Sequence, residues 1–344
     1  MTAIFYAQLF CTVADLVADK QSPGIDETRM FQAIREASDF LQKEIGWFIP
    51  VTLTRSFTGS GSKQLFVPPL LAISSIVNDD DTLTTADYIL KPDDGFWPHG
   101  PYGQLAVDPD ATLLSTWFCE KDGVVIAGRW GKYERSGTTG ATVQDSTEQG
   151  ISQSTLKISD GGKISPGMVL LVGSEQELVT GWGSPITTVT LLNGAITATD
   201  SVITVDDGAL LNISEIIRVG FEQMKVLDKQ THQCSVTRSW NGTKAVTHAD
   251  NAVVDVYRTV NVERGVNGTT AAAHLLNAAI SRYFAPDDVQ FLCKEIATLT
   301  ASKALGGYQG RTGNPEMGVV FYNDSFPKFD IEKVKRNYYI PRVG

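Results

Sequence analysis

Two histidines, His248 and His274, are the residues of this sequence that best suggest chemistry. Each lies in a phrase that begins with arginine and contains Asn-Gly-Thr: RSWNGTKAVTHADNA over 238–252 and RGVNGTTAAAHLLNA over 264–278. Near neutral pH, histidine can act as a general base or as a metal ligand. Neither histidine has a second metal ligand at a suitable spacing within its own module, so we expect no metal and no cofactor.

The repetition itself favours a structural role for both phrases. Eight of the fifteen aligned positions are identical, and a residue that recurs because each module needs it is more often structural than catalytic. Asn-Gly-Thr is typical of turns, since Asn and Gly tolerate positive φ, and we expect the Arg and His to tie the turn to neighbouring backbone. The structural residues predicted in this way are Arg238, Asn241, Gly242, His248, Arg264, Asn267, Gly268 and His274.

Other patterns that would carry catalysis are missing from the sequence. GSGSKQ over 59–64 lacks the spacing of a phosphate-binding loop, and NDDDTL over 78–83 lacks the glycine and the distal glutamate of a calcium loop. The four cysteines include no C-x-x-C pair, so they indicate neither a zinc site nor a disulfide framework and are read as thiols. We therefore expect no catalytic residue and no enzymatic activity.

Composition limits the class of protein. With 344 residues, of which 42% are hydrophobic, the chain can form two or three domains. The net charge of −10 argues against a protein that grips nucleic acid with a basic surface. The apolar opening segment has no preceding Lys or Arg, and the sequence contains no apolar run long enough to span a membrane. We expect synthesis in a reducing cytoplasm and no membrane contact.

The spacing of apolar residues predicts the elements that carry these phrases. A helix is predicted from the N-cap Asp26 to Ile45, and a second one over 286–305. Short strands separated by turns are predicted over 51–131. The polar segment SGTTGATVQDSTEQGISQST over 136–155 is predicted to be a linker or long loop. Residues 155–260 are predicted to be all β because they are rich in Val, Ile, Thr and Gly without a helical period.

A second doubling suggests how the all-β region is organised. LKISDGGKISPGMVLLVGSEQELV over 156–179 matches VITVDDGALLNISEIIRVGFEQMKV over 202–226. The order along the chain is front, front, back, back, which is most simply explained by an inner module (185–258) inside an outer one (150–184 with 259–284). Exchange of halves between two adjacent barrels is the open alternative. The predicted fold class is α+β, with a discontinuous helical and small-sheet domain (1–140 and 285–344) and two nested β-modules.

The end of the chain reverses the charge of the rest. Between Lys328 and Gly344 there are five basic and two acidic residues, a local +3. Aromatic residues interleaved with positive charge suit docking into an acidic groove of a partner protein; the alternative is a tail that folds back on its own domain. The candidate contact residues are Lys333, Lys335, Arg336, Tyr338, Tyr339 and Arg342.

In several segments the chain resembles the head-tail connector, or adaptor, proteins of long-tailed bacteriophages. The resemblance lies in CTVADLVADKQSPGIDETRMFQAIREASDFLQKEIGWFI, LFVPPLLAISSIV, ADYILKPDDG, VVIAGRWGKY and APDDVQFLCKEIATLTASKAL, in that order, and RGVNGTTAAAHLLNAAISRYF is similar to a β-module of phage neck and tail proteins. The all-β block before the last helix departs from the family pattern.

This resemblance implies a ring, commonly of twelve subunits, in the neck of the virion. The ring would join the portal to the stopper or tail and let DNA pass through its centre without specific binding, and the C-terminal tail would reach the portal. The alternative is a carbohydrate- or host-surface-binding protein of the tail, in which Trp182 and Trp240 stack on sugars; packing in a core is the more ordinary role for these two residues.

Overall fold

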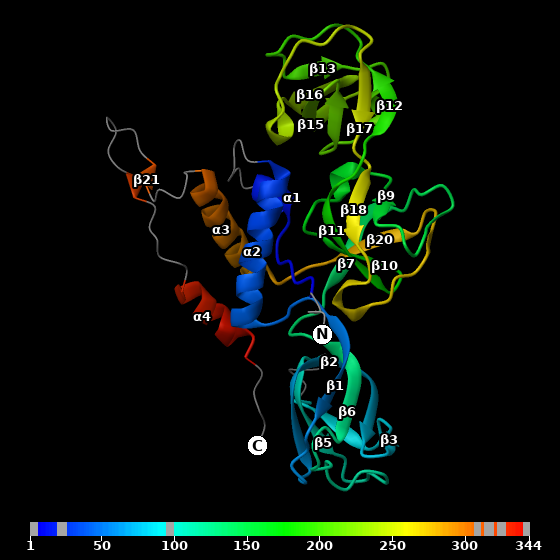
Figure 1. Ribbon diagram of the computed structural model, residues 1–344, viewed down its shortest axis with the longest axis vertical. Coiled ribbons are helices and arrows are strands. Elements are labelled where there is room, and N and C mark those ends of the chain that lie inside the picture. The colour runs from blue at the N-terminus through cyan, green and yellow to red at the C-terminus, as the bar shows by residue number, and fades with distance from the viewer. Residues whose placement is uncertain are drawn as a thin grey trace.

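The computed structural model describes residues 6–18, 26–93, 100–305, 311–312, 320–321 and 328–339. The fold is mixed α+β, mostly β, and its sheets are antiparallel. In Figure 1 the three larger sheets follow one another along the long axis of the molecule, and the helices lie beside them. No helix in the described part of the chain combines the length and the apolar character that a membrane crossing requires.

The helices are α1 (Val13–Ala18), α2 (Glu27–Ile45), α3 (Asp287–Leu305) and α4 (Lys328–Asn337). The two predicted helices are confirmed as α2 and α3. The Asp26 side chain accepts a hydrogen bond from the amide of Arg29 and so caps α2, which ends at Gly46 with φ of 88°. Helix α3 follows Pro286 and has two aspartates in its first turn, where their charge complements the helix dipole.

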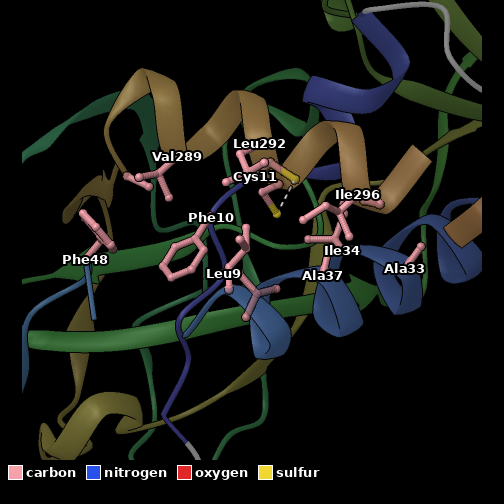
Figure 2. Packing of buried hydrophobic residues seen from close by; sticks show 14 of the residues in the cluster. Leu9, Phe10, Cys11, Ala33, Ile34, Ala37, Phe48, Val289, Leu292 and Ile296 are labelled. Atoms are coloured by element: carbon pink, nitrogen blue, oxygen red, sulfur yellow. Dashed lines mark hydrogen bonds between the residues drawn. The ribbon is translucent and has the colours of Figure 1, made fainter. Parts of the chain in front are cut away.

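The helices share one apolar core, although α2 and α3 are far apart in the sequence. Figure 2 shows Phe10 and Leu9 between the apolar faces of α2 and α3. Ile331 and Val334 of α4 are buried in the same core, together with Val169 and Leu178 from strands and Val266 from a turn. Segments near the two ends of the chain therefore form one packed unit that rests on a sheet from the middle of the chain.

The first sheet follows α2 directly. It contains β1 (Val51–Phe57), β2 (Gln64–Asn78), β3 (Asp81–Leu83), β4 (Tyr88–Lys91), β5 (Tyr102–Val107) and β6 (Val124–Trp130), in the order β1-β6-β2-β5-β4 with β3 beside β2. Strand β2 is longer than the short strands predicted over 51–131, because 64–78 form one continuous strand. The pairing of β2 with β5 shifts between Phe66 and Leu70, which accommodates Pro68 and Pro69 because proline cannot donate to a ladder.

The second and third sheets have equivalent strand orders, in which each strand of one sheet has a counterpart at the same place in the other. The second contains β7 (Ser136–Thr142), β9 (Thr155–Lys157), β10 (Val169–Val172), β11 (Glu175–Trp182), β18 (Thr259–Glu263) and β20 (Ala279–Tyr283), ordered β7-β20-β10-β11-β18-β9. The third contains β12 (Ile186–Leu191), β13 (Val202–Thr204), β14 (Ile216–Val219), β15 (Glu222–Gln230), β16 (Gln233–Thr237) and β17 (Val253–Val256), ordered β12-β17-β14-β15-β16-β13. Short pairs are formed by β8 (Glu148–Gln149) with β19 (His274–Leu275), and by β21 (Arg311–Thr312) with β22 (Val320–Phe321).

The register of the two sheets also matches. Val172 pairs with Glu175 across the β10–β11 turn, and Val219 pairs with Glu222 across the β14–β15 turn. Strand β11 then pairs with β18, and β15 with β16. An exchange of halves would instead pair β11 with β16 and β15 with β18. All six strands of the third sheet come from 186–256, whereas the second sheet takes strands from both sides of that segment.

The linker predicted over 136–155 is wrong. Strand β7 occupies 136–142 and pairs with β20, and β8 lies at 148–149. The boundary placed at 140 is therefore wrong too, because the second sheet begins at Ser136. The composition misled because β7 is a half-exposed strand at a sheet edge, rich in Thr and Gly. Its partner strand lies more than a hundred residues further along the chain, so local sequence gives no sign of the pairing.

Candidate functional site

The repeated Asn-Gly-Thr segments form two matching turns. They contain the short 3-10 helices η3 (Trp240–Gly242) and η4 (Val266–Gly268). Asn241 and Asn267 have φ of 54° and 56°, and the glycines that follow them have φ of 71° and 76°. Two successive left-handed residues explain the Asn-Gly pair, since these two residue types adopt positive φ at the least cost.

A buried glutamate from a neighbouring strand lies beside each turn and accepts hydrogen bonds from the repeated arginine. In the second sheet, Arg264 donates to Glu175 from Nε at 2.7 Å and from Nη2 at 2.8 Å, and His274 Nε2 lies 2.9 Å from Glu175 Oε2. Arg238, Glu222 and His248 repeat this arrangement in the third sheet, with distances of 2.7, 2.7 and 2.9 Å. The sequence shows both glutamates in the repeated G-x-E-Q, but it does not show that Arg and His converge on them.

Each arginine also donates hydrogen bonds to backbone carbonyls of its module. Arg264 Nη1 donates to the carbonyls of Gly150 and Gln153, and its Nη2 donates to that of Ala272. Arg238 donates in the same way to Thr197, Asp200 and Val246. A planar guanidinium with five donors can serve a carboxylate and several carbonyls at once, which a lysine cannot do. Each arginine thus joins two loops of its module to the strand that carries the buried glutamate.

The central carboxylates are held in the charged form. Burial opposes ionisation of Glu222, but hydrogen bonds from Arg238, His248 and two backbone amides outweigh it and lower its pKa to about 2. Burial likewise opposes ionisation of Glu175, and the bonds from Arg264 and from the amides of Ala272 and Gly265 hold its pKa below the ordinary value. Hydrogen bonds to the charged form outweigh desolvation at both positions.

The Asn and Thr side chains also make the same hydrogen bonds in both turns. Asn267 Nδ2 donates to Gln176 Oε1, and Asn241 Nδ2 donates to Gln223 Oε1, both at 2.8 Å. The backbone N–H groups of Gln176 and Gln223 donate to the hydroxyls of Thr269 and Thr243, respectively. The side chains of Asn and Thr are therefore fixed by the Gln that follows the buried glutamate.

Beside its Arg–Glu–His cluster the second sheet has a second buried carboxylate, that of Glu177, where the third sheet has Met224. The ligand atoms of Glu175, Glu177 and His274 all lie within 4.8 Å of one another. The premise that His274 has no potential metal ligand near it is therefore wrong. The two glutamates lie on β11, almost a hundred residues before the histidine, so spacing along the sequence could not reveal them.

A guanidinium already lies against this cluster. Arg264 Nε is 3.0 Å from Glu177 Oε1, but its hydrogen bond goes to Glu175, and Glu177 Oε1 has no hydrogen-bond partner. Burial raises the pKa of Glu177 to about 7, because the attraction of Arg264 offsets only part of the desolvation and Glu175 adds repulsion. Met224 takes the equivalent place in the third sheet, where no such charge is present.

Both turns dock onto the unit formed by the chain ends. In the second sheet, Asn267 Nδ2 donates to the carbonyl of Ala7, and a Cβ on Gly268 would lie 1.9 Å from the carbonyl oxygen of Thr52. In the third sheet, Asn241 Oδ1 accepts from the backbone amide of Glu27 at the start of α2. The same loop chemistry therefore supplies two attachment points, one for each module.

Glu27 also places the two tryptophans that were candidates for sugar stacking. Trp182 Nε1 donates to Glu27 Oε2 at 2.6 Å, and Trp240 Nε1 donates to Glu27 Oε1 at 3.2 Å. Lys225 Nζ lies 4.7 Å from the Trp240 ring centroid. Burial raises the pKa of Glu27 despite these bonds and the nearby Lys225. Both indoles thus take part in a contact between α2 and the two β-modules.

The candidate contact residues at the end of the chain divide into two groups. Lys335 pairs with Glu44 at 2.9 Å, and Tyr338 donates to Asp288 and packs edge-on against Phe48. These two side chains attach α4 to α2 and α3. By contrast, Lys333, Arg336 and Tyr339 are exposed. Arg342 lies outside the described residues.

Comparison with known proteins adds no relative. The chain matches no family model, no curated protein and no solved structure.

Proposed function

We propose that the protein is a structural virion component, a head-tail connector that forms a ring between the portal and the stopper or tail of a long-tailed phage. The observation that carries the proposal is the shared core of α2 and α3. Two of the segments that resemble the connector family, 11–49 and 285–305, lie on opposite sides of the β-rich block, and the core brings these two together. A connector-like body is thus assembled from the two ends of the chain.

In this proposal the two β-modules are an insertion in the connector body. The third sheet is complete within 186–256 and interrupts the second, which in turn separates the first sheet from α3. The attachment of each repeated turn to the body, at Ala7 and at Glu27, supports modules with a fixed orientation. Such modules would project from the ring towards the tail or away from the axis.

Lys333, Arg336 and Tyr339 are the proposed portal contacts among the described residues. All three are exposed on α4 or just after it, and Tyr339 is 68% exposed. Lys335 and Tyr338 instead hold the helix in place, so they would act on portal binding through the position of α4. An exposed tyrosine beside two cations has the composition of an interface hot spot.

Ring assembly requires a second surface for the neighbouring subunit. Phe291 on α3 is 64% exposed and is the proposed contact on this second surface. A ring closes through heterologous contacts, in which one surface meets a different one on the next copy. A net charge of −10 suits a channel that lets DNA pass without binding it.

Two experiments test the proposal. Electron micrographs of the purified protein, alone and mixed with portal assemblies of the same phage, are expected to show rings with a central hole. Particles that stay monomeric in both samples would contradict it. The double variant Lys333→Glu, Arg336→Glu should abolish co-sedimentation with the portal, whereas the control Lys121→Glu, Lys163→Glu makes the same charge change elsewhere and should not.

Deleting the whole tail is the less informative variant. Residues 328–344 include Ile331 and Val334, which are buried in the helical core, so their removal would also destabilise the body. The alternative function, glycan or host-surface binding, predicts retention of the intact chain on a glycan array and no binding to the portal. The Trp182 ring packs against Tyr257, and Lys225 Nζ lies 4.7 Å from the centroid of the Trp240 ring, so each indole already has a neighbour within the protein.

A further inference from the structure

Two thiols meet inside the core that the helices share. Cys11 Sγ and Cys293 Sγ are 3.2 Å apart, and Figure 2 shows this contact between the segment before α1 and helix α3. The two residues are 282 positions apart in the sequence. Their contact therefore joins the ends of a section of chain that contains all three large sheets.

The surroundings make the two thiols unequal. Burial raises the pKa of Cys11 well above the ordinary value. Burial also opposes ionisation of Cys293, but hydrogen bonds from Cys11, from the Ser38 hydroxyl at 3.3 Å and from the amides of Phe10 and Cys11 outweigh it and lower its pKa. Cys293 is therefore the thiol better prepared to react as a thiolate, and Cys11 lies next to it.

We propose that Cys11 and Cys293 are a site of reversible disulfide formation, for which hydrogen peroxide is the oxidant. The Cys293 thiol loses its proton and its sulfur attacks one peroxide oxygen; the O–O bond breaks, the departing oxygen takes up that proton, and a sulfenic acid and one water form. The Cys11 sulfur then attacks the Cys293 sulfur, loses its proton, and displaces the sulfenic oxygen as a second water. Two thiols and one hydrogen peroxide give one disulfide and two waters, so the sulfurs lose the two electrons that the peroxide gains.

The bond would fasten the connector-like body without altering its outer surface. Both side chains are almost fully buried, with exposed fractions of 2% and 0%, so oxidation changes the core contact and not the surface. A disulfide that closes a long loop stabilises chiefly by restricting the unfolded chain. The reduced pair is the form expected in a reducing cytoplasm, and the oxidised pair the form expected outside it. This inference does not depend on the proposed connector function.

The test uses the full chain with the variant Cys119→Ser, which removes the exposed thiol and leaves three. After treatment with hydrogen peroxide, the number of thiols titrated in denaturant should fall from three to one. A digest should contain a peptide in which Cys11 and Cys293 are linked, and dithiothreitol should restore the thiols. The melting temperature of the oxidised protein should exceed that of the reduced protein.

Cys234 is the internal control. It is buried in the core of the third sheet with no second cysteine beside it, so it should stay reduced. The proposal is overturned if all three thiols persist at a peroxide concentration that oxidises Cys119 in the wild type, or if linked peptides contain Cys234 instead. The variant Cys11→Ser should yield no linked peptide; the main measurement keeps both thiols, so it does not require that this variant folds.

Discussion

Replacing Glu177 by methionine should stabilise the protein, by an amount that grows with pH. Glu177 is buried in the second sheet, beside a pair formed by Arg264 and Glu175 that is already complete. The equivalent position of the third sheet holds Met224, which is fully buried in an apolar core. The chain itself therefore shows that the architecture accepts a methionine at this point.

The size of the effect follows from the pKa of Glu177. Its ordinary value is 4.5, and burial raises it to about 7 in the folded protein. Below pH 4.5 the carboxyl is protonated in both states and contributes no penalty. Between pH 4.5 and 7 the unfolded chain ionises first, so the free energy of unfolding falls by about 1.4 kcal/mol per pH unit, or about 3 kcal/mol in all.

Urea denaturation at pH values from 4.5 to 8 measures this effect. The free energy of unfolding of Glu177→Met, minus that of the wild type, should rise by about 3 kcal/mol between pH 4.5 and about 7 and stay constant from there to pH 8. The reciprocal variant, Met224→Glu, is the matched control and should lose stability as pH rises through the same window. Circular dichroism at each pH checks that the native fold is retained.

A difference that stays the same at every pH would refute this reasoning. It would mean that Glu177 ionises in the folded protein without penalty, with Arg264 neutralising two carboxylates instead of one. If Glu177→Met is less stable than the wild type at pH 8, the reasoning is refuted more directly, because the buried charge of Glu177 would then contribute net stabilisation.

Two further outcomes are expected. Gly268→Ala should destabilise the protein by about 2 kcal/mol or more beyond the loss in Gly242→Ala. Both residues have positive φ, but only at Gly268 would a Cβ lie against the carbonyl of Thr52. Comparable losses in thermal unfolding would show that the positive φ, and not the contact with Thr52, sets the loss of stability. Glu27→Gln should increase hydrogen exchange in the turn around Trp240, since the two indoles donate to different oxygens of Glu27 and the variant replaces one of these oxygens by an NH2 group that cannot accept. Unchanged exchange would mean that the contact does not hold the turn.

Local sequence was sufficient for the elements whose signals are local. The Asp26 cap, the Gly46 stop and the period of apolar residues predicted α2 because capping and helical spacing depend on residues within one or two turns of each other. The Asn-Gly pairs predicted the two turns, since the left-handed conformation restricts residue type at each position. Repetition of two phrases indicated paired modules before any strand was placed.

Contacts between distant segments were decided only by the tertiary structure. Glu175 meets Arg264, and Cys11 meets Cys293, because antiparallel pairing and helix packing close long stretches of chain. Nothing near β7 in the sequence reveals β20, so the segment resembled a linker. A residue's local pattern fixes its backbone conformation and the face it presents, whereas its partner depends on which surfaces the rest of the chain must bury together.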